Sequence, residues 1–576
     1  MKMLTDRMQL KRSHQKGPQK ANIFIDGAGK RQKDMMRGRI VMVGILLLAV
    51  YSVIGLRLTE LANTEDQTAK NGGQAVNPLM LARPDLTDRN GEVMAKDLTT
   101  FSLSADPRKI AFPEEVVEQL AAVLPEINKL QILRRLRSDA KFAWIKRELT
   151  PAQQQEILNL GIPGLHFDTE TRRFYPGGRV ASHLVGHVDI DNHGTAGFEK
   201  FIDTNWLNDL RAVGFSETYR PKPVKMSIDM RVQHVVHDEL IHAMERYQAV
   251  AAVGVVLDAK TGEVVAMSSL PDYDPNHPQK TLNSETLNRA TAGVFEMGST
   301  FKAMTTAMAL ESGRITMNDH IDATHPIRHG RFTIRDFHAK KRVLSVPEVF
   351  IYSSNIGTVK MAQAVGPNSH RNFLSKLGLL NASSHELPEI GKPIEPGKWK
   401  ELSSMTISFG HGISVTPLQT VVAAAAILNG GKLIPPTFRP RTIEEANLLA
   451  TQVVSPETSL DMRYLFRLNV EKGSGKRADV PGFYIGGKTG TAEKVVNGKY
   501  SSEKKLNSFL SAFPADDPQY VMLVMIDEPQ PEEGQEAATA GLNAAPTTAA
   551  IIRRIGLTLG LTPRLDNYLN PIEVRN

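Results

Sequence analysis

The sequence contains no cysteine. This absence excludes disulfide frameworks, zinc–thiolate sites, iron–sulfur clusters and cysteine nucleophiles. A phosphate-binding loop, a dinucleotide fingerprint and an EF-hand are also missing. His385-Glu386 is not followed by a second histidine four residues on, which a helical zinc motif requires. We expect His234, His237 and His242 to be solvated or packed side chains on a helix, and we predict no metal and no cofactor.

An excess of positive charge is absent outside the N-terminal tail. The 576 residues include 69 Lys and Arg against 62 Asp and Glu, a net charge of +7. The first 39 residues hold 11 basic and 3 acidic side chains, which leaves a net charge of −1 for the other 537 residues. A near-neutral body with one basic tail is not typical of a general polyanion binder, so we expect no nucleic-acid partner.

Charge is also absent from residues 40–56, a run of 17 residues closed by Arg57. A helix of this length spans about 26 Å, near the lower limit for crossing a bilayer. A cleavable signal peptide is the alternative, but 39 residues precede the run and no small-residue cleavage site directly follows it. Because the basic side is N-terminal, we predict an uncleaved single-pass anchor with its N-terminus in the cytoplasm.

The rest of the chain predicts a mixed α+β fold. Residues 57–80 read as a polar linker, residues 81–221 mix short strands with amphipathic helices, and two prolines at 221 and 223 indicate a boundary. Next we expect a helix at 233–247, a hairpin of strands at 250–257 and 263–269, helices at 303–312 and 419–428, and strands at 484–487 and 520–526. Strands, then helices, then strands are typical of α+β domains. Residues 529–546 are expected to form a surface loop.

Ser299 and Lys302 open the first of three motifs with chemical content. Both are expected at the start of a helix, where residues three apart share a face, so the lysine amine can reach the serine hydroxyl. A lysine with a lowered pKa can remove the proton of a serine that is otherwise a poor nucleophile. Alone this spacing is a weak signal, since Ser13/Lys16 and Ser138/Lys141 share it.

The second motif is Ser353-Ser354-Asn355, and the third is Lys488-Thr489-Gly490-Thr491. Ser353 offers a hydroxyl that can relay a proton, and the amide of Asn355 can orient a peptide carbonyl. On a strand, Thr489 and Thr491 share one face and Gly490 leaves room for a ligand backbone. With the charge of Lys488, this third motif suits a substrate that ends in a carboxylate. A second Lys-Thr-Gly at residues 260–262 lies in the expected hairpin turn and reads as a turn.

These three motifs, in this order, are the signature of penicillin-binding proteins and β-lactamases. From the anchor to about residue 560 the chain resembles class B penicillin-binding proteins, membrane-anchored D,D-transpeptidases of bacterial peptidoglycan. Matching segments are 83–91, 172–176, 183–188 and 194–200 in the non-catalytic part, and 271–276, 410–412, 416–419, 508–514 and 544–546 in the catalytic part. Met297 departs from the family, which usually has proline there, and we expect it to loosen the turn before the nucleophile.

The resemblance implies a penicillin-binding transpeptidase fold, a five-stranded antiparallel sheet flanked by helices, with an N-terminal pedestal domain and one transmembrane helix. We predict a basic cytoplasmic tail at 1–39, the anchor at 40–56, a periplasmic pedestal of the penicillin-binding-protein dimerisation type at 57–221 and the transpeptidase domain at 222–576. No glycosyltransferase motif precedes Ser299, which disfavours a class A enzyme. The resemblance places the protein in the cell inner membrane, with the catalytic domain in the periplasm.

The implied reaction is cross-linking of stem peptides through a serine acyl-enzyme. Ser299 would attack the penultimate D-Ala, Lys302 would act as base and Ser353 would relay the proton to the leaving D-Ala. Asn355, Lys488, Thr489, Gly490 and Thr491 would bind the donor, with the backbone N–H groups of residues 299 and 491 as the oxyanion hole. β-Lactam antibiotics are the expected inhibitors.

Chain length, the basic tail and residues 83–95 resemble the septal, FtsI-type branch, which implies a SEDS-type glycosyltransferase and other division proteins as partners. An elongation-type class B transpeptidase is the alternative. A β-lactamase or D,D-carboxypeptidase is disfavoured because Leu377 stands where class A lactamases carry the glutamate that activates water. A non-catalytic β-lactam-binding scaffold is disfavoured by the intact motifs.

Overall fold

The computed structural model describes residues 42, 45–55, 83–207, 221–280, 284–496 and 498–564. Contacts divide the chain into two units, residues 1–78 and 79–576. In the first unit, residues 45–55 are helical with exposed side chains. Among the described residues, no helix has both the length and the apolar character needed to cross a membrane. The predicted anchor at 40–56 is described only in part, and the predicted tail at 1–39 lies outside the described residues.

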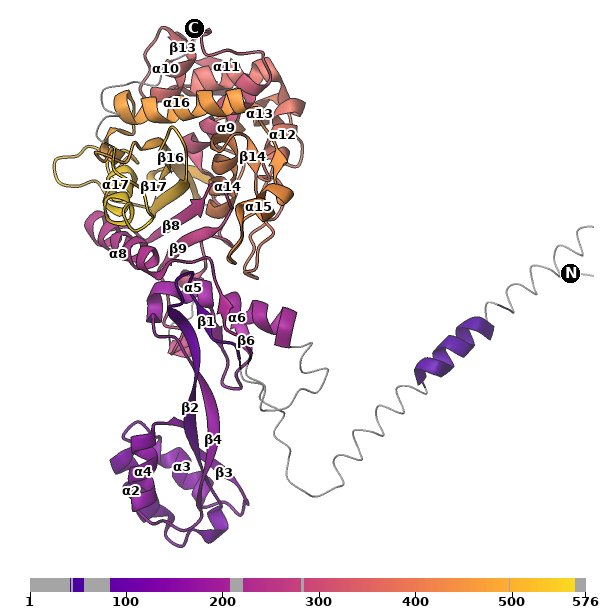
Figure 1. The fold of residues 1–576 in the computed structure, drawn as a ribbon, viewed down its shortest axis with the longest axis vertical. Coiled ribbons are helices and arrows are strands. Elements are labelled where there is room, and N and C mark those ends of the chain that lie inside the picture. The colour runs from indigo at the N-terminus through magenta and orange to yellow at the C-terminus, as the bar shows by residue number, and fades with distance from the viewer. Residues whose placement is uncertain are drawn as a thin grey trace, which may run out of the picture. The chain divides into compact units, whose positions relative to one another are not determined.

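The N-terminal part of the second unit is a twisted sheet with a small helical head. Strand β2 (Val93–Ala105) pairs with β1 (Leu86–Thr87), β3 (Ala143–Leu149) and β4 (Leu165–Phe174), and β1 pairs with β7 (Val224–Lys225). β2 and β4 run side by side as a long ribbon (Figure 1). Helices α2 (Pro113–Val123), α3 (Lys129–Leu136) and α4 (Pro151–Asn159) enclose a separate apolar core with the ends of these strands.

A buried ionic network joins the segments that carry the family resemblance in this part. Glu199, at 0% exposure, lies between two arginines: Arg83 Nε donates to its Oε2 at 2.8 Å and Arg173 Nε donates to its Oε1 at 2.7 Å. Arg83 also reaches Asp203 at 2.6 Å, and Arg173 reaches Asp97 at 2.9 Å. Segments 83–91, 172–176 and 194–200, far apart in sequence, therefore meet at one point. Glu199 is on α6 (Gly197–Ile202), which follows α5 (Ser182–Val185) and the β5–β6 pair (His187–Val188, Gly194–Ala196).

The C-terminal part is built on a five-stranded antiparallel sheet, as the family resemblance implies. Its order is β16 (Gly486–Val496), β17 (Lys499–Phe513), β18 (Tyr520–Asp527), β8 (Ala251–Asp258) and β9 (Val264–Leu270). Alternate side chains of β8 and β18 enter two different cores, because successive residues of a strand point to opposite faces. Both faces are therefore covered by helices.

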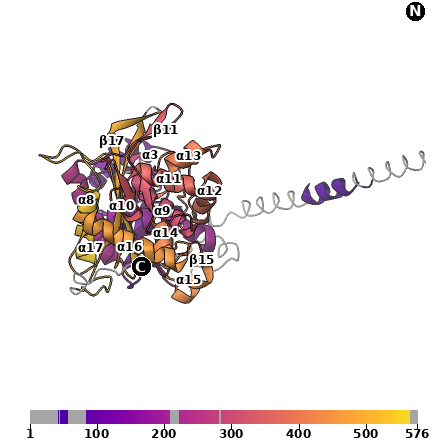
Figure 2. The same cartoon turned by 90° about the horizontal axis from the view of Figure 1, so that it is seen from above.

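One face packs against α8 (Met230–Tyr247) and α17 (Ala544–Ile555), and the other against α9 (Phe301–Glu311), α14 (Pro417–Leu428) and α16 (Pro456–Lys472). Figure 2 shows α8 and α17 together on one side, with α9 and α14 towards the other. The remaining helices are α10 (Val346–Ile351), α11 (Asn355–Val365), α12 (Pro367–Lys376), α13 (Glu401–Ile407) and α15 (Ile443–Leu449). The remaining paired strands are β10 (His320–Asp322) with β13 (Val343–Ser345), β11 (Ile327–His329) with β12 (Phe332–Ile334), and β14 (Lys432–Leu433) with β15 (Thr451–Gln452).

The predicted loop at 529–546 is wrong at its C-terminal end, because α17 begins at Ala544. Asn543 caps this helix, its side chain accepting from the Ala544 N–H at 2.7 Å, and the alanine-rich first turn is buried against the sheet. An Ala/Gly-rich composition does not separate a loop from a closely packed helix start.

Candidate active site

Ser299 lies in a 3₁₀ turn, Gly298–Thr300, that leads directly into α9. Gly298 has φ 53°, and a Cβ at this position would lie 3.0 Å from the backbone oxygen of Thr491. A hydrogen bond within the turn closes it: Thr300 Oγ1 donates to the Met297 carbonyl at 2.9 Å. The Met297 side chain is buried. The turn is thus closed by a hydrogen bond with methionine at the position where the family usually has proline, and the expected loosening stays a prediction.

Two lysine amines converge on Ser353. Lys302, one turn into α9 from Ser299, donates from Nζ to the Ser353 carbonyl and, at 3.0 Å, to Ser353 Oγ. Lys488 reaches the same Oγ from β16, also at 3.0 Å. Both lysines are buried, with exposures of 1% and 0%. The structure thus brings the three motifs together, although the hydrogen bonds of the Lys302 amine go to Ser353 and not to the Ser299 hydroxyl.

The backbone of Ser353 is in the left-handed region, with φ 55°. Such a conformation costs a non-glycine residue roughly 1–3 kcal/mol and is maintained only where the surrounding structure fixes it. Here the Ser353 N–H donates to Phe350 and the Ser354 N–H donates to Val349, at 3.2 and 3.0 Å. The resulting turn between α10 and α11 directs the Ser353 hydroxyl to both lysines.

Burial makes both lysines weaker bases than lysines in water. The pKa of Lys488 is lowered to about 7 by desolvation. The pKa of Lys302 is lowered well below its ordinary value by desolvation and by the neighbouring Lys488 charge, with Asp336 opposing the shift. Because the two charges disfavour each other, the pair readily holds one proton fewer than two free lysines. A neutral amine beside Ser353 and the serine turn can accept a proton near neutral pH.

Asn355 begins α11, and its side chain has a protein partner: Nδ2 donates to the Arg335 carbonyl at 2.8 Å. Asp336 ties down the same turn, accepting from Ser354 Oγ at 2.8 Å and from the Ile356 N–H at 2.9 Å. Asp336 therefore fixes the turn that carries Ser353 and also raises the proton affinity of Lys302. Sequence reasoning missed it, because a single aspartate 18 residues before Ser354 gives no pattern.

The third motif lies on β16, next to the serine turn. Thr489 Oγ1 lies 2.6 Å from Ser474 Oγ, and Thr491 Oγ1 accepts from the Ala540 N–H at 3.2 Å. A Cβ on Gly490 would lie 2.6 Å from Ser508 Oγ on β17, and 2.8 Å from both the Met297 carbonyl oxygen and Thr300 Cγ2. The glycine is thus required by the close approach of β16 to the serine turn, a cause distinct from the ligand space expected from the sequence.

A second group that the sequence did not reveal surrounds Glu296. Its Oε1 accepts from the Gly412 N–H at 2.9 Å and from Tyr500 Oη at 3.2 Å. These bonds link the segment just before the Gly298–Thr300 turn to residues 410–412 and to the β16–β17 hairpin. Burial raises the pKa of Glu296, and burial together with Glu296 raises the pKa of Tyr500 to about 12. The His411 ring packs 5.3 Å from Tyr500, and burial with the Lys302 charge lowers its pKa to about 4, so it is neutral at pH 7.

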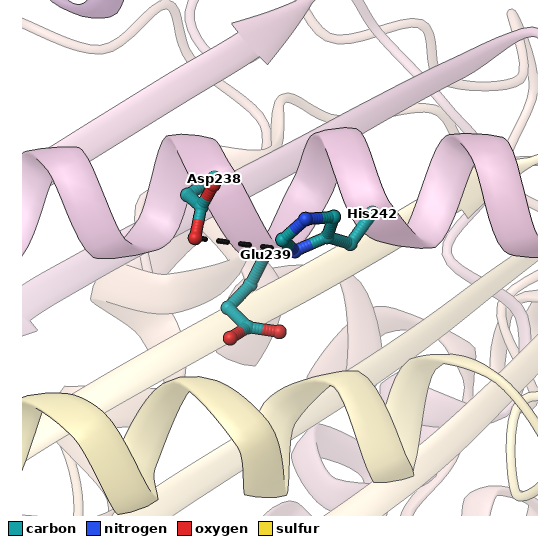
Figure 3. A group of neighbouring side chains, drawn as sticks. All are labelled: Asp238, Glu239 and His242. Carbon is teal, nitrogen blue, oxygen red and sulfur yellow. Dashed lines mark ion pairs between the residues drawn. The ribbon is translucent and has the colours of Figure 1, made fainter.

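Asp238, Glu239 and His242 on α8 place possible metal ligands close together (Figure 3). The carboxylates of Asp238 and Glu239 already pair with Arg554, which lies 2.7 Å from Glu239. His237, on the same helix, pairs with Asp272 at 2.6 Å. Arg554 therefore joins α17 to α8 through ion pairs with Asp238 and Glu239.

Comparison with known proteins identifies the class. The family of the penicillin binding protein transpeptidase domain matches residues 252–553, and the penicillin-binding protein dimerisation domain matches residues 81–203. The fold resembles the crystal structure of a peptidoglycan synthetase from Bifidobacterium adolescentis, with a TM-score of 0.65 and 20% identity over 86% of this chain and 97% of that one. The chain belongs to the penicillin-binding protein transpeptidase family, in its class B.

The similarity extends to named relatives along nearly the whole chain. The chain is 37% identical to the "Probable peptidoglycan D,D-transpeptidase FtsI" of Caulobacter vibrioides, over 94% of this chain and 91% of that protein. It is 29% identical to the "Peptidoglycan D,D-transpeptidase FtsI" of Escherichia coli (strain K12), over 91% and 92%. These matches confirm the resemblance to class B penicillin-binding proteins that the three motifs indicate. The domain limits at residues 57, 221 and 222 stay predictions.

Proposed function

We propose that the protein is a peptidoglycan D,D-transpeptidase of the septal, FtsI type. The convergence of two buried lysine amines on Ser353 Oγ, beside the turn that carries Ser299, is the observation that supports it most strongly. A serine with a deprotonated amine nearby and a charged lysine on the adjacent strand suits acyl transfer from a substrate ending in a carboxylate.

In the proposed reaction, Ser299 Oγ attacks the carbonyl of the penultimate D-Ala and Lys302 takes its proton. The tetrahedral oxyanion is stabilised by the backbone N–H groups of Ser299 and Thr491. The peptide bond to the terminal D-Ala breaks, and its nitrogen receives a proton through Ser353. An amine from a neighbouring strand then attacks the ester, forms the cross-link and returns the hydroxyl to Ser299. Lys488, Thr489 and Thr491 hold the terminal carboxylate, while Asn355 orients the donor amide.

Hydrolysis as the main activity has less support. Leu377, the position where a class A lactamase carries its glutamate, is 1% exposed and packs in the apolar core. A carboxylate that could activate water is therefore missing at that position, and the acyl-enzyme should persist until an amine arrives.

The reaction is tested with the purified full-length protein, a donor peptide ending in D-Ala-D-Ala and an amine acceptor. We expect D-Ala release together with the new amide product, and neither with Ser299→Ala. Ser284→Ala, an exposed serine outside the three motifs, is the matched control and should behave as wild type. D-Ala release without any amide product at saturating acceptor would contradict the transpeptidase assignment and favour a carboxypeptidase.

We further propose that residues 40–56 anchor the protein in the cell inner membrane, with the first 39 residues in the cytoplasm and the catalytic part in the periplasm. The basic tail and the uncharged run support this topology. Because the chain has no cysteine, Ser13→Cys and Ser138→Cys each introduce a single thiol. A membrane-impermeant maleimide applied to spheroplasts should label residue 138 and spare residue 13. Equal labelling of both would contradict the proposed topology.

A septal role is proposed from the FtsI names of the relatives, together with a SEDS-type glycosyltransferase and other division proteins as partners. A single helix in the bilayer can pack against a polytopic partner. Depletion should then block division and give filaments, with a fluorescent fusion at midcell. Swollen round cells with label along the side wall would support the elongation-type alternative.

A further inference from the structure

Residues 325–342, here called the basic segment, concentrate positive charge on a body that is otherwise near neutral. The segment lies between β10 and β13 and contains the β11–β12 hairpin. Its only acidic residue is Asp336, and its six cations are all exposed: Arg328, Arg331, Arg335, Lys340, Lys341 and Arg342. The segment thus carries a net charge of +5 within 18 residues, whereas all residues after 39 together carry −1.

Most of this charge has no counterion in the part of the chain that the structure describes. Arg342 pairs with Glu348 at 2.6 Å, and Asp336 is occupied by the N-terminal turn of α11. No carboxylate among the described residues pairs with Arg328, Arg331, Arg335, Lys340 or Lys341. Cations held close together without counterions repel one another, so an anionic ligand that lies across them is favoured.

The basic segment also exposes two aromatic rings. Phe332 is 48% exposed and Phe337 is 76% exposed, and Arg331 lies over the Phe332 ring at 5.3 Å. Exposed rings beside unpaired cations suit a ligand that offers both carboxylates and less polar surface, such as sugar rings. A simple solvated charge run would not need these rings at the surface.

The segment is bonded directly to the active site. Asn355 donates to the Arg335 carbonyl at 2.8 Å, and Ser354 donates to Asp336 at 2.8 Å, so the basic surface begins next to Ser353. A substrate held at Ser299 that extends beyond its reacting end can continue over this surface. Charge next to the site would raise the local concentration of an acidic polymer and guide it to the serine.

We propose that the basic segment binds carboxylate-bearing peptidoglycan, that is, glycan strands with acidic stem peptides, as an extension of the active site. The inference rests on the proposed function, since it names the polymer that the site would act on. Arg328, Arg331 and Lys341 provide the unpaired charges that contact the carboxylates. Phe332 and Phe337 contact the less polar faces of the polymer.

The test is co-sedimentation of the full-length protein, in detergent, with isolated peptidoglycan sacculi. R328A/R331A/K341A should bind about tenfold more weakly than wild type, as expected for the loss of three exposed ion pairs. K376A/K392A/K398A removes three exposed lysines elsewhere and should bind as wild type. R328K/R331K/K341R keeps the charge and should retain binding, which separates lost charge from lost folding.

Two further measurements decide the source of the binding. Wild type should bind sacculi whose carboxylates have been converted to neutral amides no more tightly than R328A/R331A/K341A does. Added salt should weaken the binding of wild type to native sacculi. Equal sedimentation of R328A/R331A/K341A and K376A/K392A/K398A would overturn the proposal. So would undiminished binding to amidated sacculi, or preferential binding to vesicles containing anionic phospholipid. Labelling of Ser299 by penicillin is measured in parallel on wild type, so a failure of the proposed function is seen separately.

Discussion

Replacing Lys488 by arginine should move the alkaline limit of acylation. Burial lowers the pKa of Lys488 to about 7, and the pKa of Lys302 is lowered by burial and by the Lys488 charge. The state suited to catalysis holds Lys302 neutral as base and Lys488 charged for the substrate carboxylate. The value of kcat/KM reports the ionisation of the free enzyme. As the pH is raised, kcat/KM should therefore first rise as Lys302 loses its proton, and then fall above about pH 7 as Lys488 loses its own.

The size of the effect follows from that pKa. At pH 9, two units above a pKa of about 7, roughly 1% of Lys488 keeps its proton, so kcat/KM should be about 100-fold below its maximum. A guanidinium stays charged throughout this range. K488R should therefore lose less than about threefold between pH 7 and pH 9 when normalised to its own maximum. The normalisation is needed because arginine is larger than the buried lysine that it replaces.

The assay is stopped-flow acylation by a chromogenic β-lactam that carries a carboxylate, followed from pH 5.5 to 10. Lys504→Arg is the matched control: Lys504 is exposed and pairs with Glu528 at 2.9 Å, so the profile should not change. The same alkaline fall in K488R and wild type would refute the reasoning, because the charge of Lys488 would then not set the limit.

Three further changes test other parts of the molecule. Lys302→Ala should slow penicillin acylation at least about 100-fold through loss of the general base, measured by stopped-flow against Lys376→Ala as an exposed control. A smaller loss would assign the base elsewhere. Glu296→Gln keeps an acceptor for Gly412 and Tyr500, so its rate of penicillin acylation should stay within about threefold of wild type. Glu296→Leu removes the acceptor and should acylate about tenfold or more slowly. Equal rates for the two variants would show that the contacts of Glu296 with Gly412 and Tyr500 have no role in acylation. Glu199→Leu leaves Arg83 and Arg173 buried without their shared carboxylate, so the free energy of unfolding measured by urea denaturation should fall by about 3–5 kcal/mol. A fall of less than about 1 kcal/mol would contradict a stabilising role for this ionic network.

The sequence predicts the scaffold of the site well because its signals are local. The hairpin strands β8 and β9 and the helix α8 follow from apolar patterning and turn residues, and the structure gives them within a few residues of the expected bounds. The Lys-Thr-Gly at residues 260–262 lies in the turn between β8 and β9, as its position indicates. The other Lys-Thr-Gly lies on the edge strand β16, beside the serine turn.

Contacts between distant segments could not be predicted from the sequence. Ser299 and Lys302 are three residues apart, yet the Lys302 amine bonds to Ser353, because the tertiary packing of α9 against the α10–α11 turn decides its direction. Asp336 and Glu296 contact the site through segments that carry no motif of their own. The positive charge of the basic segment is present in the sequence, but only its bonds to Asn355 and Ser354 place it at the site.

The most direct test of the central claim is mass mapping of the site that benzylpenicillin acylates in the full-length protein. We predict one covalent adduct, on Ser299, that persists for many minutes because Leu377 provides no carboxylate for water activation. Ser299→Ala should carry no adduct, and Ser284→Ala should carry the wild-type one. Rapid hydrolysis of the antibiotic, or an adduct on a residue other than Ser299, would contradict a transpeptidase built on this serine.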